Sequence, residues 1–246
     1  MVKISIELVP RSEESLRREL SQVRSHFPQV ERINIPDILR FDLRSWDGCA
    51  IAGDYFPKTI PHLRAIDFDP DAPLQIVDKL SNAGIEAVLV ITGDLPQDMG
   101  HKCYRTNCLE MIRRLKRELP QLKVYAGMDP YRSGIKEEID YVKAKHDAGA
   151  DAFFTQPFFD LRLMEIYQGF LQHVDVYWGV SPVLTENSQN YWENKNNAVF
   201  PPDFAPNLTW NRDFAAKALE FARANNSNIY FMPIRTDIVK YLHGII

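Results

Sequence analysis

A glutamate inside an apolar stretch near the start of the chain is the first residue whose placement suggests chemistry. Glu7 lies in the alternating, β-branched segment 3–8, between Ile6 and Leu8. A carboxyl group is costly to bury unless it is paired or transfers protons, and burial raises its pKa toward the range of a general acid. We therefore predict that Glu7 is a catalytic acid. The alternative is an outward-facing glutamate on an edge-like first strand.

A second acidic residue follows a nearly continuous apolar run. Asp94 comes after the segment 87–92, in Thr92-Gly-Asp-Leu-Pro, where Gly93 allows a sharp turn and the close approach of a ligand. This placement predicts that Asp94 is a catalytic residue of the site. An aspartate before Leu-Pro is also good turn chemistry, so a purely structural role stays open.

An amide stands next to aromatic rings at the end of another apolar segment. Gln156 closes the segment 152–155 and is followed closely by Phe158 and Phe159. An amide with a donor edge and an acceptor edge beside such rings suits a planar heterocycle better than a metal or a phosphate. Gln156 and Phe158 are therefore predicted to bind substrate. The two rings could equally begin a helix and belong to the core.

Histidine and cysteine residues give weaker signals. His62 lies in Ile60-Pro-His-Leu, where a hydrogen-bonded core histidine competes with a site residue. His101, Cys103 and Cys108 superficially resemble zinc ligands, but no fourth ligand follows at a standard spacing, and the neighbouring Lys102 and Arg105 would repel a cation. We expect no metal site. Gly-rich dinucleotide, Walker A and Gly-x-Ser-x-Gly motifs do not occur in the sequence.

Strand-like and helix-like segments alternate along the chain and must position these residues. The predicted strands are 3–8, 32–35, 59–66, 87–92, 123–126, 152–155, 176–179 and 228–232. Helical patterns lie at 12–25, 73–82, 107–119, 135–148, 161–173 and 213–225. This alternation favours an α/β (βα)8 barrel of the TIM type over an open doubly wound sheet. In such a barrel, Glu7, Asp94 and Gln156 would all point toward the catalytic mouth.

One domain accounts for the whole sequence. A barrel of this kind uses about 250 residues, and residues 1–246 show no linker or break in composition. The segment 185–210 is rich in Asn, Pro and aromatic residues, and we predict an irregular excursion there, between the seventh and eighth strands. A loop that long is typically functional or disordered. A second irregular stretch is predicted at 41–57.

Composition excludes several classes of protein. The chain has 33 acidic and 29 basic residues, so it has no net positive field to hold a phosphate backbone, and we exclude nucleic acid as a partner. Its apolar runs are far shorter than the roughly 20 residues of a membrane helix, and residues 1–9 are too short for a signal peptide. The cysteine count of 3 argues against a disulfide framework. We expect a cytoplasmic protein that does not bind membranes.

Several motifs, taken in order, resemble the methylenetetrahydrofolate reductase family. The match runs over roughly the first 185 residues, and residues 231–235 continue it. Each motif is weak alone, but their common order at barrel spacing is specific. They are Ser5-Ile-Glu-Leu-Val-Pro, Pro61-His-Leu, Thr92-Gly-Asp-Leu-Pro, Lys145-His-Asp-Ala-Gly-Ala-Asp, Thr155-Gln-Pro-Phe-Phe-Asp and Gly179-Val-Ser-Pro-Val.

The resemblance implies a flavin-dependent barrel that reduces 5,10-methylenetetrahydrofolate to 5-methyltetrahydrofolate. Hydride would pass from NAD(P)H to FAD and then to the folate. Glu7 matches the family's general acid, which agrees with the independent case for a buried carboxyl. Asp94 matches an aspartate that contacts the pterin and tunes the flavin, and Gln156 matches a glutamine that reads the pterin edge. Arg235 falls where a substrate-binding arginine is expected.

The flavin side of the resemblance is less complete than the folate side. Lys145 and His62 match flavin-contacting positions, whereas Thr92 stands where the family usually has arginine and Glu138 replaces an aspartate. The run Asn34-Ile-Pro-Asp lacks the family's threonine. The run Gly127-Met-Asp-Pro-Tyr stands where the family has a Tyr-Pro-Glu-x-His type of sequence, so the ring that packs on the flavin is not matched there.

Three functions are therefore compatible with the sequence. The first is a divergent reductase that holds FAD through different contacts or with a partner subunit. The second is a flavin-free tetrahydrofolate-binding enzyme that transfers methyl or methylene groups. The third is a non-catalytic folate-binding or assembly subunit. All three predict a small-molecule folate ligand, and the sequence does not decide whether the chain forms a homo-oligomer.

Overall fold

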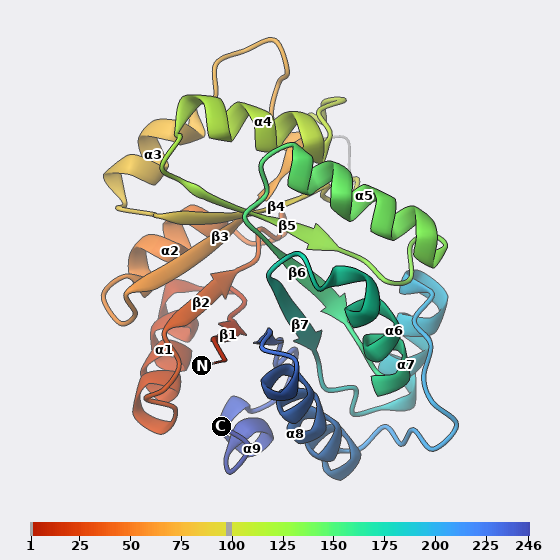
Figure 1. The fold of residues 1–246 in the computed structure, drawn as a ribbon. Helices are drawn as coiled ribbons and strands as arrows, with labels where there is room; N and C mark the ends of the chain where they lie inside the picture. The colour runs from red at the N-terminus through yellow and green to blue at the C-terminus, as the bar shows by residue number, and fades with distance from the viewer. Residues whose placement is uncertain (1, 97–99) are drawn as a thin grey trace.

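The computed structural model describes residues 2–96 and 100–246. Within these residues, eight parallel strands close into a barrel in the order β1 to β8, which confirms the predicted (βα)8 architecture (Figure 1). Every predicted strand is present. The strands are β1 Ile4–Glu7, β2 Arg32–Ile35, β3 Lys58–Arg64, β4 Ala87–Ile91, β5 Lys123–Met128, β6 Ala152–Pro157, β7 Val176–Val180 and β8 Asn228–Phe231.

Helices form the outer layer of the barrel. Side-chain caps fix where several of them begin: Ser12 and Asn107 both form reciprocal capping boxes, at α1 and α4. None of the helices in the described residues is long and apolar enough to cross a membrane. The helices are α1 Glu13–His26, α2 Ser45–Ala52, α3 Ile76–Asn82, α4 Cys108–Glu118, α5 Ile135–Asp147, α6 Leu161–Leu171, α7 Glu186–Asn196, α8 Leu208–Ala224 and α9 Ile238–Leu242, with a 3₁₀ turn at Ala65–Asp67.

Alternation along the strands separates two cores. Successive side chains point to opposite faces, so Ile4 and Ile6 of β1 pack under the helices, whereas Ser5 and Glu7 face the barrel axis. The larger core lies between strands and helices. The smaller core fills the barrel with Ile60, Leu89, Ala152, Phe154, Tyr177, Tyr230 and Met232, so the barrel is packed and not a pore.

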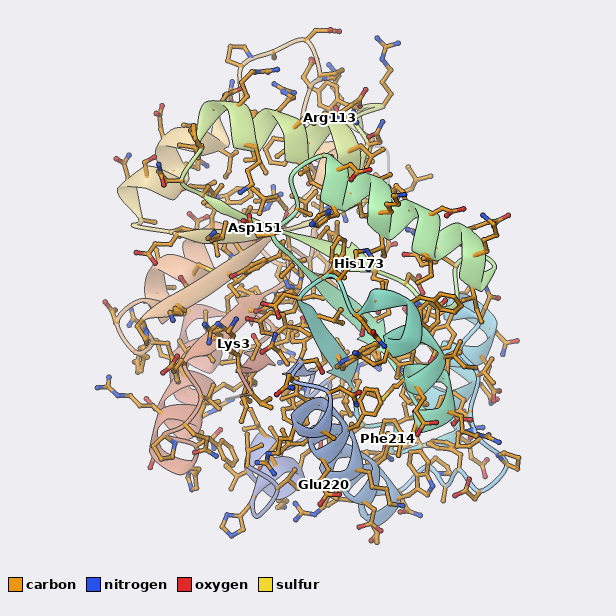
Figure 2. All side chains as sticks on the ribbon, in the orientation of Figure 1. Lys3, Arg113, Asp151, His173, Phe214 and Glu220 are labelled. Atoms are coloured by element: carbon orange, nitrogen blue, oxygen red, sulfur yellow. The ribbon has the colours of Figure 1, made fainter. Side chains whose placement is uncertain are left out.

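Polar groups gather at the two ends of the barrel and on its outside. Figure 2 shows Lys3 and Asp151 in the centre of the ring of helices, close to where β1 and β6 begin, and Arg113 and Glu220 on the outer helices α4 and α8. Lys3 Nζ lies 3.2 Å from Asp175 Oδ2, another residue that precedes a strand. An exposed ion pair therefore lies at the amino-terminal end of the barrel. In barrels of this type the site lies at the other end, where the strands finish.

The predicted irregular segments are partly helical. Thr185 caps α7 by accepting from Ser188 N, and Asn197 ends it in the left-handed region at φ 52°. Because α7 has no buried residue, it lacks the apolar stripe that would reveal a helix in the sequence. The helix α8 begins at Leu208, before the predicted start at 213, and α2 lies within the stretch 41–57.

The rest of segment 185–210 packs against the side of the barrel. Phe200 stacks on Phe159 with ring centroids 4.4 Å apart, and Trp192 meets the same ring edge-on at 5.6 Å. Phe204 in turn contacts Phe200 and Trp210. The aromatic content that marked this segment in the sequence therefore builds a satellite core next to α6 and α8.

Close packing between β6 and β7 predicts a stability effect. A Cβ atom at Gly179 would lie 2.4 Å from the carbonyl oxygen of Thr155 and 2.9 Å from that of Gln156, and neither backbone can yield easily. We expect Gly179→Ala to destabilise the protein by about 2 kcal/mol or more in urea unfolding. Gly169→Ala in α6 is the control, because a Cβ there meets nothing within 4 Å. That variant should be neutral or slightly stabilised, and equal losses in both variants would contradict the prediction.

Candidate active site

The last residue of β1 places a carboxyl group inside the barrel. The side chain of Glu7 is 10% exposed, and its Oε2 accepts a hydrogen bond from the hydroxyl of Tyr230 on the neighbouring strand β8. Burial raises the pKa of Glu7 from 4.5 to about 7, and the hydrogen bond from Tyr230 partly opposes this rise. A carboxyl group with such a pKa exchanges protons near neutral pH, as a general acid must.

Neutral polar groups surround Glu7 within the barrel. Ser5 Oγ donates to Asn34 Oδ1 at 2.8 Å, and Asn34 Nδ2 lies 3.4 Å from His62 Nε2. His62 Nε2 is 3.9 Å from Glu7 Oε2, but burial lowers the pKa of His62 to about 3, so the ring is neutral and the contact is not an ion pair at neutral pH. On the side that faces the barrel axis, the polar groups closest to Glu7 are therefore uncharged.

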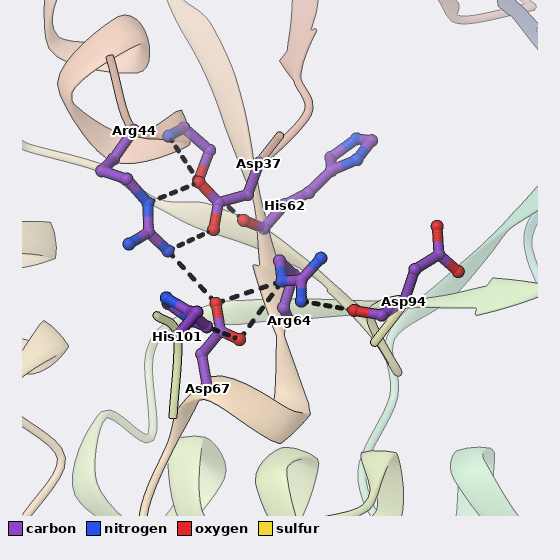
Figure 3. Close-up of polar contacts among 8 residues, drawn as sticks. Asp37, Arg44, His62, Arg64, Asp67, Asp94 and His101 are labelled. Carbon is purple, nitrogen blue, oxygen red and sulfur yellow. Dashed lines mark hydrogen bonds and ion pairs between the residues drawn. The ribbon is translucent and has the colours of Figure 1, made fainter. Parts of the chain in front are cut away.

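A buried network of ion pairs holds the neighbouring part of the mouth (Figure 3). Arg44 donates to both oxygens of Asp37, at 2.8 and 2.5 Å, and to Asp67 at 3.2 Å. Arg64, the last residue of β3, donates through Nε to Asp67 at 3.1 Å and through Nη2 to the carbonyl oxygen of Asp94 at 2.6 Å. The network thus ties the segment after β4 to β3.

Gly93 lets the segment after β4 lie close to Arg64. Its φ is +89°, and a Cβ at this position would lie 2.9 Å from Arg64 Cβ. Asp94 follows immediately and is exposed. Figure 3 shows its carboxylate pointing away from the ion-pair network, and that carboxylate has no hydrogen bond or ion pair to any residue the structure describes. The carboxylate of Asp94 is therefore on the surface, where a ligand could reach it.

The other predicted folate-side residues also follow the ends of strands, and all but one of them are exposed. Gln156 is exposed near the end of β6, and Arg235 is exposed in the loop after β8, with a left-handed φ of 55°. A non-glycine residue in that region is strained, which is common where a loop serves a ligand. Phe158 is the exception: it is fully buried and packs against Tyr167 and Trp178. It cannot contact a substrate at the mouth, so we remove it from the predicted site.

A cleft of about 230 Å³ reaches Glu7 from the outside. Its walls come from the segment after β1, from α1 and from the loop after β8, and include Arg18, Glu19 and Thr236. Ile234 and Thr236, the neighbours of Arg235 in that loop, both line the cleft. Glu7 is thus buried but connected to solvent.

Two side chains that match flavin-contacting positions in the family are bonded to other groups of the protein. Lys145 Nζ donates to the carbonyl oxygen of Gly127 at 2.6 Å, and its side chain is 2% exposed. Glu138 accepts from Asp129 N at 3.0 Å and from Arg132, and its side chain is 1% exposed. These two side chains have no surface to offer a phosphate or a ribose, so they do not fit a role in holding FAD.

The remaining two flavin positions are also engaged. His62 is directed into the barrel toward Asn34, and Thr92 Oγ1 lies 3.4 Å from Cys108 Sγ. Thr92 is nevertheless exposed and could be reached by a ligand. In the described residues, no group of three or more His, Cys, Asp or Glu side chains is arranged to hold a metal, and His101 lies 3.2 Å from Asp67.

Sequence reasoning missed the residues that shape the proton donor. Tyr230 and Asn34 are inward-facing on β8 and β2, and Arg64 anchors the segment that carries Asp94. The signal for Tyr230 was its spacing from Asn228 within a strand, since residues two apart share a face. The pattern within β8 did not show which residue of another strand Tyr230 would contact.

The pKa of Glu7 predicts how stability depends on pH. Between pH 4.5 and about 7 the folded protein keeps a proton on Glu7 that the unfolded chain releases. Its contribution to stability is therefore complete below pH 4.5 and is lost as the pH rises through 7, a change of about 3 kcal/mol. We expect the unfolding free energy of the wild type minus that of Glu7→Gln to fall by this amount between pH 4.5 and about 8. Urea unfolding measures it, and a constant difference would show that the carboxyl is not buried in this way.

Comparison with known proteins links this barrel to one family. The family model described as methylenetetrahydrofolate reductase matches residues 49–186. The 5,10-methylenetetrahydrofolate reductase of Buchnera aphidicola subsp. Acyrthosiphon pisum (strain APS) is 26% identical over 151 residues, which cover 58% of this chain and 51% of that protein. The enzyme of the same name from Escherichia coli (strain K12) is 26% identical over 152 residues, covering 58% and 50%. The chain spans about half the length of the curated relatives it matches.

Solved structures support the barrel and nothing finer. A structure of oxaloacetate acetylhydrolase with oxalate gives a TM-score of 0.60 at 15% identity, covering 94% of this chain and 75% of that one. A 2,3-dimethylmalate lyase gives 0.59 at 12% identity, with 95% and 75% covered. At such identities the likeness shows the fold alone. The sequence match is more informative, because it covers more than half of the 246 residues and includes the segments that carry Asp94 and Gln156. The chain belongs to the methylenetetrahydrofolate reductase family.

Proposed function

We propose that this barrel binds 5,10-methylenetetrahydrofolate at its carboxyl end and reduces it to 5-methyltetrahydrofolate, with Glu7 as the proton donor. The observation that carries the proposal is the buried carboxyl of Glu7, inward-facing at the end of β1, with a pKa of about 7. Family membership supports the substrate class. Glu7 lies outside the matched residues 49–186, so its role is argued from geometry and motif.

The chemistry requires one proton and one hydride. A proton from Glu7 would go to the ring nitrogen that leaves as the imidazolidine opens, so that the carbon–nitrogen bond breaks with its electrons on nitrogen. The remaining iminium carbon then accepts hydride and becomes the methyl group. Glu7 suits this step because burial keeps its proton in place near neutral pH, whereas an ordinary exposed glutamate would be ionised.

Three exposed side chains at the mouth would orient the folate. The exposed carboxylate of Asp94 can accept from the N–H groups of a pterin, and the amide of Gln156 can pair with its donor and acceptor edge. Arg235 would bind an anionic or carbonyl group of the substrate. Below them, Phe154, Tyr230 and Met232 form an apolar floor that excludes water from the reacting centre.

Family membership suggests a hydride donor for this reaction, but the local contacts do not support that donor. The family scheme uses FAD reduced by NAD(P)H. In this chain Glu138 and Lys145 are buried and bonded within the protein, so FAD could be held only through other contacts. This observation favours a second candidate, a flavin-free tetrahydrofolate-binding enzyme of one-carbon transfer. A non-catalytic folate-binding subunit would use the same mouth without the proton transfer.

Substitution of Glu7 tests the proton donor. Glu7→Gln keeps the size and the polar contacts of the side chain, so we expect folate binding in calorimetry to persist while reduction falls at least about 100-fold. Glu86→Gln is the control, because this exposed residue precedes β4 at the opposite end of the barrel. Unchanged reduction in Glu7→Gln would remove Glu7 from its role. Binding without any turnover in the wild type would favour the non-catalytic candidate.

A visible spectrum tests the cofactor. Because Glu138 and Lys145 are buried and bonded within the protein, we expect the desalted protein to be colourless. In the reductase case, incubation with FAD restores the absorption band of bound flavin and the reduction of folate by NAD(P)H. A protein that binds folate yet stays colourless in excess FAD supports the flavin-free candidate. Tightly bound FAD in the purified protein would show that the contacts of Glu138 and Lys145 were misjudged.

A further inference from the structure

We propose that Tyr230 is a positioning residue, which holds the carboxyl group of Glu7 in place and governs its proton affinity. The inference rests on the proposed function of Glu7 as proton donor. Tyr230 would not touch the reacting atoms of the substrate. Its effect would act through the hydrogen bond that its hydroxyl donates to Glu7 Oε2.

The register of the barrel closure places the phenol against the carboxyl group. Strand β8 pairs with β1 so that Tyr230 stands opposite Ser5, and Glu7 is the next inward-facing residue along β1. A phenol is long enough to reach one inward position further up, where the carboxyl lies. Only a long side chain with a terminal donor can make this contact from this position.

Packing leaves the Tyr230 ring little freedom to move. It is 3% exposed and meets Phe154 edge-on, with centroids 5.1 Å apart and an interplanar angle of 84°. Phe154 in turn stacks on Tyr177 at 4.1 Å. The aromatic core of the barrel thus fixes the Tyr230 hydroxyl, and the hydrogen bond from this hydroxyl restrains the Glu7 carboxyl in turn.

Tyr230 is the principal contact that stabilises the ionised form of Glu7. His62 from β3 is neutral, and Asn34 from β2 bears no charge and also bonds to Tyr230. Arg11, Arg18, Glu19 and Asp237 line the cleft beside Glu7. Among the residues that the structure describes, no lysine or arginine lies within ion-pair distance of the Glu7 carboxyl. The carboxylate form is therefore stabilised chiefly by the phenol, and burial opposes it.

The hydroxyl of Tyr230 has a purely polar role. Phenylalanine would fill the same volume and make the same edge-on contact with Phe154, without the cost of burying a hydroxyl. Burial raises the pKa of Tyr230 far above its usual value, and the neighbouring Glu7 raises it further, so the group remains a hydrogen-bond donor at any working pH. Its presence in an apolar core is explained by the contact with Glu7.

Infrared spectroscopy of Tyr230→Phe tests the proposal directly. The carboxyl stretch of protonated Glu7 is isolated by subtracting the spectrum of a matched protein that carries Glu7→Gln. Loss of a hydrogen bond to a charged group is expected to move the titration midpoint of Glu7 upward by about 1 to 2 pH units. The alkaline limb of the pH profile for folate reduction should move in the same direction.

Tyr177→Phe is the matched control. Tyr177 is another buried tyrosine of the barrel core and stacks on the same Phe154, but it has no contact with Glu7. Its loss of a hydroxyl should leave the titration midpoint unchanged. If Tyr230→Phe does not fold, Tyr230→Leu removes the same hydroxyl and carries the same expectation.

The outcomes separate this inference from the proposed function. A folded Tyr230 variant with an unchanged Glu7 midpoint would overturn the inference, even if the variant is less stable or less active. The spectroscopic titration needs no folate. It therefore still decides the role of Tyr230 if the protein proves not to reduce folate at all, a result that would overturn only the proposed function.

Discussion

The site depends on one contact, the hydrogen bond from Tyr230 to the buried carboxyl of Glu7. The two residues are 223 positions apart in the chain and meet only because β8 pairs with β1 and closes the barrel. Burial alone would make the carboxyl a poor donor of its proton, and full exposure would leave it ionised. The barrel interior provides the burial, and the phenol partly offsets it, so that the pKa of Glu7 falls near 7.

At the carboxyl end of the barrel, a network of ion pairs supports a segment that carries an exposed carboxylate. Below the surface, Arg44 and Arg64 are paired with Asp37 and Asp67, and Arg64 also holds the carbonyl oxygen of Asp94. Above it, the carboxylate of Asp94 has no partner among the described residues. On the surface such ion pairs would contribute little to stability, but here they fix the direction of the segment after β4. The Asp94 carboxylate on that segment stays exposed, where a ligand could reach it.

A residue type shared with a family does not by itself preserve a role. Lys145 and Glu138 match cofactor positions in the sequence, yet in the structure they tie α5 to the end of β5 through Gly127, Asp129 and Arg132. Burial lowers the pKa of Lys145 to about 8, and its ammonium group lies 3.8 Å from the ring centroid of Tyr141. These are contacts of a folded core.

The sequence by itself determined the eight strands, their order and the end of the barrel where Glu7, Asp94 and Gln156 lie, because period-two apolar patterns and turn residues are local signals. It did not reveal α7, in which no residue is itself buried, or the burial of Phe158, which could have faced either way at a strand end. Only the tertiary structure decided which groups touch Glu7 and that Lys145 is used internally. Those facts depend on barrel closure and on contacts between distant segments, which a linear pattern does not encode.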